Sequence, residues 1–366
     1  MQTMKTETGA RLLAVDNLRV LLTVLVVAHH VAVTYGNIPL WYYTEPAADP
    51  SGVALDILVV LNQAFFMGFF FLISGFFTPG SHDRKGGRAF VRDRLVRLGV
   101  PLLVFLLLLR PLLTIGEHGM PFWKWYIVSW DPGPMWFVEV LIVFTLLYAW
   151  WRRAGRSGGP RDGTQEAGTQ QAGAPSLKGV VLFTLGLAAA TLLWRIPVPQ
   201  GTYVPVLGLP TPYFLPQYAA MFAAGVVAFR RGWFEALPRR AGRAGFVVAG
   251  VATVLLLPLA ALTTGLVAVA VNALWESVFA VGMIVGLVVL FRERFARQGP
   301  RGGFLSANAY AVYVIHPLVL VAVAWAVRGL HAAAVVKFAL VLAVSLPLCW
   351  GLAYAVRSLP GARRVL

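Results

Sequence analysis

The amino-acid sequence predicts an all-α, polytopic membrane protein with ten transmembrane helices and both termini in the cytoplasm. Of its 366 residues, 58% are hydrophobic and 13% are charged, against about 25% charged in a typical soluble domain. A soluble chain of this composition would expose large apolar patches to water. A disordered chain requires low hydrophobicity, and the single cysteine, Cys349, excludes a disulfide scaffold.

Ten stretches of the chain are apolar and long enough to cross a bilayer, which takes about 20 residues of helix. The second and eighth stretches are long enough to tilt, whereas the third and fourth are short. Only Thr263, Thr264 and Gly265 separate the seventh stretch from the eighth. The stretches cover approximately residues 14–35, 53–78, 98–115, 135–151, 179–196, 213–229, 244–262, 266–291, 304–327 and 334–356.

The positions of the basic residues support this count. Lys and Arg accumulate in cytoplasmic loops, and with the N-terminus inside, most of the 31 basic residues fall in the termini and in alternate loops. A wrong count would scatter them over both sides. The net charge of +16 is then explained by topology and by contact with anionic lipid head groups, so no nucleic-acid partner is expected. Five basic residues fall elsewhere: Arg110, Lys124, Arg195, Arg328 and Lys337.

The chain is predicted to form one membrane domain over residues 1–366. Within it, residues 152–178 are rich in Gly, Ser, Gln and Thr, which predicts a flexible cytoplasmic linker between two halves of the bundle. The abundance of Ala, Gly, Val and Arg suggests a GC-rich bacterium. The sequence leaves the oligomeric state open.

Ionisable side chains within the spans are costly to place in lipid and therefore indicate function. Arg19 and His30 lie eleven residues apart in the first span. This is close to three helical turns, so both face nearly the same side, with about 16 Å of rise between them. The spacing predicts a guanidinium at the inner mouth of a pore and an imidazole deep on the same face. His29 points about 100° away and is expected to pack.

Three further residues add to this pattern. His316 lies twelve residues into the ninth span, about 18 Å from the inner face and close to the depth of His30. Arg94 and Arg97 share one helical face at the cytoplasmic mouth, and arginine forks suit phosphate groups. The positive-inside rule also predicts arginine there, so this pair alone is weak evidence.

Other polar side chains in the spans have a structural explanation as well as a functional one. Hydrogen bonds between helices explain one group: Asn62, Gln63, Ser74 and Asn272. Snorkelling or ion pairing near the outer ends of the spans explains a second group equally well: Asp56, Arg110, Lys124 and Glu139. The remaining polar groups are Glu276 in the eighth span and Tyr310 and Tyr313 in the ninth.

Five segments stand out along the chain in a fixed order. They are Val15–Arg19 leading to His30, Phe70–Phe77, Arg94–Arg97 followed by Leu98 and Pro101, Trp136–Leu141, and Tyr310–Pro317. Together they resemble the marks of the acyltransferase-3 family of membrane acyltransferases, over nearly the whole chain. Within this family the chain looks most similar to the glucans biosynthesis protein C branch of glucan succinyltransferases. That similarity lies in Thr34-Tyr35-Gly36, Trp41-Tyr42-Tyr43, Glu45 and Trp136–Glu139.

The resemblance implies an enzyme of the bacterial cell membrane. Such an enzyme transfers an acetyl or succinyl group from cytoplasmic acyl-CoA to a hydroxyl of a glycan or of another envelope or secondary-metabolite acceptor. The expected roles are coenzyme A binding by Arg19, Arg94 and Arg97, general base for His30, and an acidic partner of His30 in Glu139 or Glu276. His316 is expected either to line the acyl site or to orient another group. Substrate contacts are expected from Tyr310, Tyr313, Ser74 and Asp56, and no metal is expected.

Two other classes of function fit part of the sequence. A ten-span transporter or exporter of a glycan or small molecule would use buried His and Glu as a proton relay, but the inverted repeats and paired broken helices of transporters are not evident in the sequence. A sensor or scaffold without chemistry would not need Arg19 and His30 aligned across one span. Acyl transfer itself has two routes, direct transfer, which we favour, and a covalent acyl-histidine intermediate.

Overall fold

The computed structural model describes residues 2–38, 41–115, 119–155, 173–204 and 208–366, with side chains described from residue 13 onward. The structure is 80% helical, and its described residues form no strand. Ten helical segments are long and apolar enough to cross a membrane. This confirms the prediction of a multi-pass, all-α membrane protein.

Several of the ten segments are built from more than one helix. The segments comprise α1 (Gln2–Tyr35), α2 (Gly52–Gln63) with α3 (Phe66–Lys85), α4 (Gly87–Arg94) through α5 (Val100–Val104) to α6 (Arg110–Leu113), α7 (Phe122–Val128) with α8 (Trp136–Ala154), α9 (Leu177–Arg195), α10 (Leu215–Arg231), α12 (Arg239–Leu262), α13 (Gly265–Arg294), α14 (Pro300–Ala326) and α15 (Ala334–Ser358). The short helix α11 (Trp233–Ala236) joins α10 to α12. As predicted, the break between α12 and α13 falls just before Gly265, whose φ is +60°.

The second span is broken, where the sequence predicted one continuous helix over residues 53–78. The helix stops after Gln63 and restarts at Phe66, with a φ of −134° at Phe65. A side chain of α10 stabilises the broken region, because Gln217 Nε2 donates to the Ala64 carbonyl at 2.8 Å. A polar side chain from a neighbouring helix thus satisfies the backbone group that the break frees within the membrane.

The third span is longer and less regular than the predicted 98–115. It covers Gly87–Leu113 and contains two π-helical turns, Leu95–Gly99 and Phe105–Leu109. Proline disturbs the helical hydrogen bonds here, because Pro101 has no N–H to donate to the carbonyl of Arg97 four residues earlier. Tyr310 Oη of α14 donates to that Arg97 carbonyl at 3.1 Å. The irregular third span is thereby fastened to α14.

The predicted linker over residues 152–178 is only partly described. Helix α8 continues to Ala154 and α9 begins at Leu177, so both ends of the predicted linker belong to helices. Residues 156–172, which make up most of it, lie outside the described residues. The structure therefore corrects the ends of this segment.

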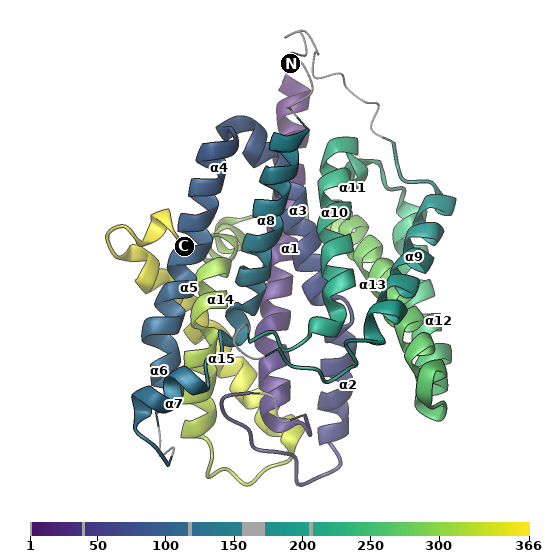
Figure 1. Ribbon diagram of the computed structural model, residues 1–366. Helices are drawn as coiled ribbons and strands as arrows, with labels where there is room; N and C mark the ends of the chain where they lie inside the picture. The colour runs from purple at the N-terminus through teal and green to yellow at the C-terminus, as the bar shows by residue number, and fades with distance from the viewer. Residues whose placement is uncertain (1, 39–40, 116–118, 156–172, 205–207) are drawn as a thin grey trace.

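Helix α1 lies in the middle of the bundle (Figure 1) and contacts α2, α3, α13, α14 and α15. This central position brings the polar residues of α1 into the interior. Helices α3 and α10 pack closely through glycine. A Cβ on Gly75 would lie 2.1 Å from the Phe222 carbonyl oxygen, and one on Gly225 would lie 2.0 Å from that of Leu72. Small residues at such a crossing let helix backbones approach one another.

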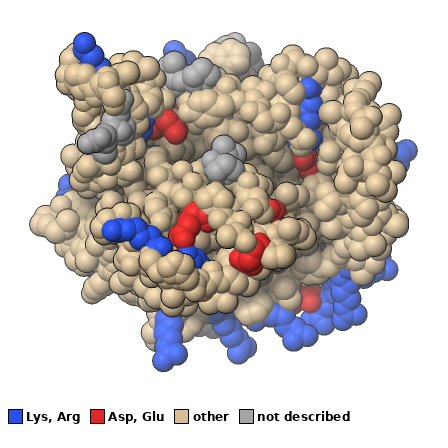
Figure 2. All heavy atoms as spheres, turned by 90° about the horizontal axis from the view of Figure 1, so that it is seen from below, with Lys and Arg blue, Asp and Glu red and all other residues tan. Residues whose placement is uncertain are grey.

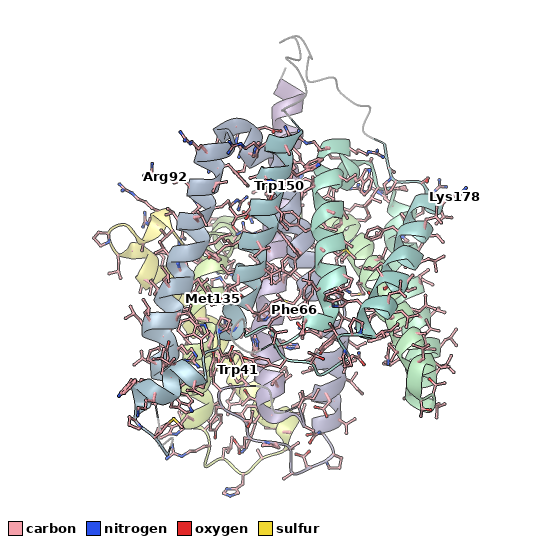
Figure 3. The ribbon with its side chains drawn as sticks, in the orientation of Figure 1. Trp41, Phe66, Arg92, Met135, Trp150 and Lys178 are labelled. Atoms are coloured by element: carbon pink, nitrogen blue, oxygen red, sulfur yellow. The ribbon has the colours of Figure 1, made fainter. Side chains whose placement is uncertain are left out.

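The two ends of the bundle differ in charge. Figure 3 places Arg92 and Lys178 near the end from which the N-terminus projects, and Trp41 and Phe66 in the opposite half. Figure 2 views the opposite end, where acidic side chains lie near the middle and most of the visible basic side chains lie at the margin.

Candidate active site

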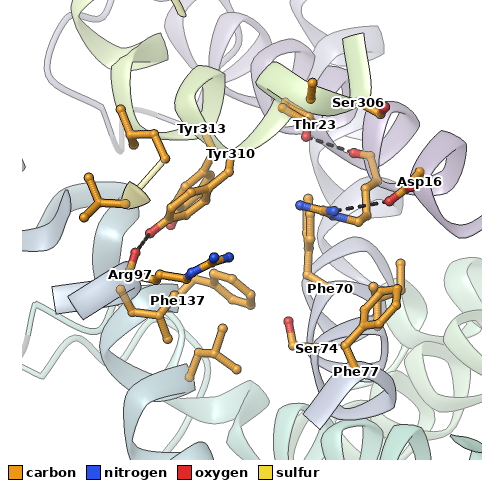
Figure 4. A pocket seen from close by; sticks show the side chains of 18 of the residues that line it. Asp16, Thr23, Phe70, Ser74, Phe77, Arg97, Phe137, Ser306, Tyr310 and Tyr313 are labelled. Carbon is orange, nitrogen blue, oxygen red and sulfur yellow. Dashed lines mark hydrogen bonds and ion pairs between the residues drawn. The ribbon is translucent and has the colours of Figure 1, made fainter. Parts of the chain in front are cut away.

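A cavity of about 710 Å³ lies among α1, α3, α8, α14 and the Arg94–Leu98 segment (Figure 4). We name it the arginine cavity, because four guanidinium groups line it: Arg19, Arg94, Arg97 and Arg364. Its walls also carry hydroxyl groups and aromatic rings: Thr23, Ser74, Ser306, Tyr310, Tyr313, Phe70, Phe77 and Phe137. This lining suits an anionic ligand that also has an apolar part.

The arginine cavity carries more positive charge than its carboxylates neutralise. Arg19 Nη1 lies 3.3 Å from Asp16 Oδ1, and Arg97 Nε lies 3.3 Å from Asp93 Oδ1. Among the described residues, Arg94 Nε has no hydrogen-bond partner. Planar guanidinium groups with free N–H donors bind phosphate in a bidentate manner. The cavity therefore offers a site for a phosphate-bearing ligand.

A second cavity, of about 260 Å³, lies deeper along α1. We name it the histidine cavity, because His29 and His30 both line it. Its walls combine aromatic rings with amide and carboxylate groups: Phe66, Trp136, Tyr213, Phe214, Trp275, Gln63, Gln200 and Glu276. Aromatic faces and polar side chains together suit a hydroxylated ligand, which has both apolar faces and hydrogen-bonding groups.

His30 of α1 and His316 of α14 form a hydrogen-bonded pair. His30 Nδ1 lies 3.1 Å from His316 Nε2, and the ring centroids are 5.0 Å apart in a stacked arrangement. His316 Nδ1 lies 2.6 Å from the Tyr313 carbonyl. A carbonyl can only accept, so Nδ1 of His316 carries a proton, and in the neutral imidazole its Nε2 accepts from His30 Nδ1. Nε2 of His30 is then the nitrogen left to act as a base.

Trp41 stacks on a face of the His30 ring. The ring centroids are 3.9 Å apart with an interplanar angle of 20°. His29 meets His30 edge-on at 5.5 Å and stacks on Phe66 at 5.1 Å. The packing predicted for His29 is therefore present, although His29 also lines the histidine cavity. An aromatic face against an imidazole fixes the orientation of the imidazole ring.

The segment that carries Trp41 is held to the bundle at several points. Asn37 donates to the Asp56 carboxylate from its backbone N at 2.8 Å and from its side chain at 2.7 Å. Hydrogen bonds from Ser51 and from the Ala334 backbone hold the pKa of the Asp49 carboxyl below its usual value. The sequence suggested that Asp56 contacts substrate. In the structure Asp56 holds Asn37 instead and lines neither cavity.

Of the two candidate acidic partners of His30, Glu276 is engaged in an ion pair and Glu139 lies outside both cavities. Glu276 Oε2 pairs with Arg195 Nη2 at 2.5 Å, and its Oε1 accepts from Gln200 Nε2 at 3.3 Å. Glu139 is half-buried on α8 and lines neither cavity. The structure therefore corrects the expected His–carboxylate pair. The hydrogen-bond partner of His30 is a second histidine, His316. Glu276 lines the histidine cavity while it forms an ion pair with Arg195 of α9.

Apart from Asp56 and Glu139, the predicted site residues line one of the two cavities or contact a residue that does. Six of them line the arginine cavity: Arg19, Ser74, Arg94, Arg97, Tyr310 and Tyr313. His30 and Glu276 line the histidine cavity, and His316 supports His30 from a fully buried position. Across the described residues, no group of three or more His, Cys, Asp or Glu side chains is arranged to hold a metal ion.

Sequence reasoning missed three residues that contribute to the site: Arg364, Arg195 and Trp41. Arg364 looked like one more basic residue of a cytoplasmic terminus. Arg195 gave a usable signal, because it was one of five basic residues that the positive-inside rule did not explain. Trp41 belonged to a segment that carried the family resemblance, but its contact with His30 could not be predicted, since the rotation of a loop against a helix cannot be read from spacing.

Nearly the whole chain matches one family model. The family model described as an acyltransferase domain matches residues 12–354, which include the residues of both cavities except those at the C-terminal end. No match to the chain was found among curated proteins or among solved structures. Because the model covers nearly the whole chain, the protein belongs to the acyltransferase-3 family and is a membrane acyltransferase.

Proposed function

We propose that the chain moves a short acyl group from acyl-CoA to a hydroxyl of a carbohydrate, with His30 as general base. The observation that carries this proposal is the 3.1 Å contact between His30 and His316, which leaves a basic nitrogen beside a cavity that adjoins the arginine cavity. The resemblance to glucan succinyltransferases favours an acetyl or succinyl group and a glucan-like acceptor.

The donor is assigned to the arginine cavity. Coenzyme A carries a diphosphate and a further phosphate, and these groups match guanidiniums with free donors. Arg19, Arg94 and Arg97 hold the phosphates in this proposal, with Arg364 as a fourth cation. The apolar rings of the same cavity receive the pantetheine arm. By the positive-inside rule, this end faces the cytoplasm, where acyl-CoA is available.

The acceptor is assigned to the histidine cavity, where Glu276, Gln200 and Gln63 present hydrogen-bonding groups among aromatic rings. Nε2 of His30 takes the proton of the acceptor hydroxyl as its oxygen attacks the thioester carbonyl carbon. A carbon–oxygen bond forms, the carbon–sulfur bond breaks, and the coenzyme A thiolate takes the proton back from the imidazolium. The products are an ester and the free thiol of coenzyme A.

The test measures transfer by the purified chain from radiolabelled acetyl-CoA and succinyl-CoA to a panel of oligosaccharides. We expect Arg94→Ala/Arg97→Ala to raise the KM for acyl-CoA by at least about 10-fold with kcat little changed, because each lost phosphate contact is worth about 1.5–3 kcal/mol. No transfer to any hydroxyl acceptor by the wild-type chain would contradict the proposal.

A control pair separates phosphate binding from general charge. Arg88 and Arg92 lie on the same helix as Arg94, both are exposed, and neither lines the arginine cavity. Arg88→Ala/Arg92→Ala therefore removes the same charge and should leave the KM unchanged. Equal KM values in the two double variants would remove the phosphate-binding role of Arg94 and Arg97.

A further inference from the structure

The arginine cavity and the histidine cavity share two lining residues, Met67 and Tyr313. The four guanidiniums line only the first cavity, and His29 and His30 line only the second. A ligand whose phosphates lie in the first cavity must therefore pass Met67 and Tyr313 to reach His30. These two side chains, one from α3 and one from α14, form the boundary between the cavities.

The Tyr313 side of this boundary is fixed. Tyr313 Oη donates a hydrogen bond to the Pro134 carbonyl, and Pro134 itself lines the histidine cavity. The Tyr313 ring packs edge-on against Phe137 at 6.1 Å. Its backbone carbonyl also accepts from Nδ1 of His316. Because both its ring and its backbone carbonyl form contacts, the Tyr313 side chain is held in one position.

On the other side of the boundary, the break in the second span fixes the position of the Met67 backbone, whereas the Met67 side chain is flexible. Met67 lies in the first turn of α3, just after the break at Ala64 and Phe65. Gln217 holds the Ala64 carbonyl at 2.8 Å, and a Cβ on Gly68 would lie 2.9 Å from Gln217 Oε1. The backbone around Met67 is thus confined. An unbranched thioether with several rotatable bonds adapts to what passes it.

We propose that Met67 and Tyr313 form the aperture through which the acyl group reaches His30, and that the side chain at position 67 limits the length of the acyl group. The inference rests on the proposed function, because it takes acyl-CoA as the donor. The histidine cavity, of about 260 Å³, must also receive the acceptor hydroxyl. A short acyl group is therefore favoured, and a smaller residue at position 67 admits a longer one.

The test compares kcat/KM for octanoyl-CoA and acetyl-CoA, with an acceptor that the wild-type chain acylates. Met67→Ala should raise the octanoyl-to-acetyl ratio by about 10-fold or more, since a few methylenes in a shaped pocket discriminate by that factor. Met67→Phe should lower the ratio for butyryl-CoA against acetyl-CoA. Met221→Ala is the matched control, because Met221 is also buried, on α10, and lines neither cavity.

An unchanged ratio in Met67→Ala, or the same increase in Met221→Ala, would overturn the aperture while leaving the proposed function in place. If the wild-type chain transfers from no acyl-CoA at all, the donor assignment and the aperture are both wrong. The two failures are thereby distinguishable, because only the second affects the wild-type protein.

A labelling measurement tests the aperture independently of the acceptor. The only cysteine of the chain, Cys349, is fully buried, so a maleimide reports on Met67→Cys. If the acyl-CoA arm occupies the aperture, saturating acetyl-CoA should slow this labelling several-fold. Equal labelling rates with and without acetyl-CoA would contradict the aperture even if the activity of the variant is low.

Discussion

The proton on Nδ1 of His316 decides which nitrogen of His30 is basic. The Tyr313 carbonyl, 2.6 Å from His316 Nδ1, holds the proton on that nitrogen. His316 Nε2 therefore accepts the hydrogen bond from His30 Nδ1 at 3.1 Å, which leaves Nε2 of His30 basic. Helical spacing was enough to predict that Arg19 and His30 share the interior face of α1 and that His316 lies at a similar depth. It was not enough to pair the two histidines, because their contact depends on how α1 and α14 are rotated toward each other.

The His316 side chain lines neither cavity, so its effect should be confined to the chemical step. We expect His316→Ala to lower kcat by about 100-fold, the lower range of what general base catalysis contributes, with the KM for acetyl-CoA unchanged. Steady-state kinetics of the purified variant measure both.

The control for this variant is His82→Ala, which removes another buried histidine that packs against Phe90 and Tyr148 and lines neither cavity. A wild-type kcat in His316→Ala would show that the histidine pair has no role in catalysis. An equal loss in His82→Ala would show that reduced stability alone explains the effect.

The helices of the bundle were predictable in number but not in their irregularities. Hydropathy and the positions of basic residues depend only on local sequence, so ten spans could be counted. The helix break at Ala64 and the ion pair between Arg195 and Glu276 could not be predicted, since each depends on a partner far along the chain. Gln217, which holds the break, lies 153 residues from Ala64.

The close crossing of α3 and α10 gives a direct test of how these helices are held. Gly75→Ala places a Cβ 2.1 Å from the Phe222 carbonyl oxygen, so the helices must separate. We expect a loss of about 2 kcal/mol, seen as a lower melting temperature of the full chain in detergent. Activity should fall with it, because α3 carries Met67 and Ser74.

Gly250→Ala on α12 is the matched control for this crossing. A Cβ at Gly250 meets no atom within 4 Å, so the substitution should leave the melting temperature unchanged or raise it slightly, given the higher helix propensity of alanine. Equal melting temperatures for the Gly75 and Gly250 variants would mean that the crossing is looser than the structure indicates.

In the whole molecule, two cavities of different chemistry meet inside one bundle. Among the residues that the structure describes, four arginines line one cavity, two histidines and a carboxylate line the other, and only Met67 and Tyr313 line both. In our proposal this arrangement brings a donor from the basic end of the bundle to an acceptor held deeper within it. The charge pattern from which the topology was predicted therefore also predicts which side supplies the donor.

The most direct test of this account measures transfer of radiolabel from acetyl-CoA, which does not cross membranes, in oriented vesicles from cells that express the chain. We predict transfer when acetyl-CoA is added to inside-out vesicles, no transfer with right-side-out vesicles, and a loss of at least about 100-fold in inside-out vesicles that carry His30→Ala. Wild-type rates from folded His30→Ala, or transfer only in right-side-out vesicles, would contradict it.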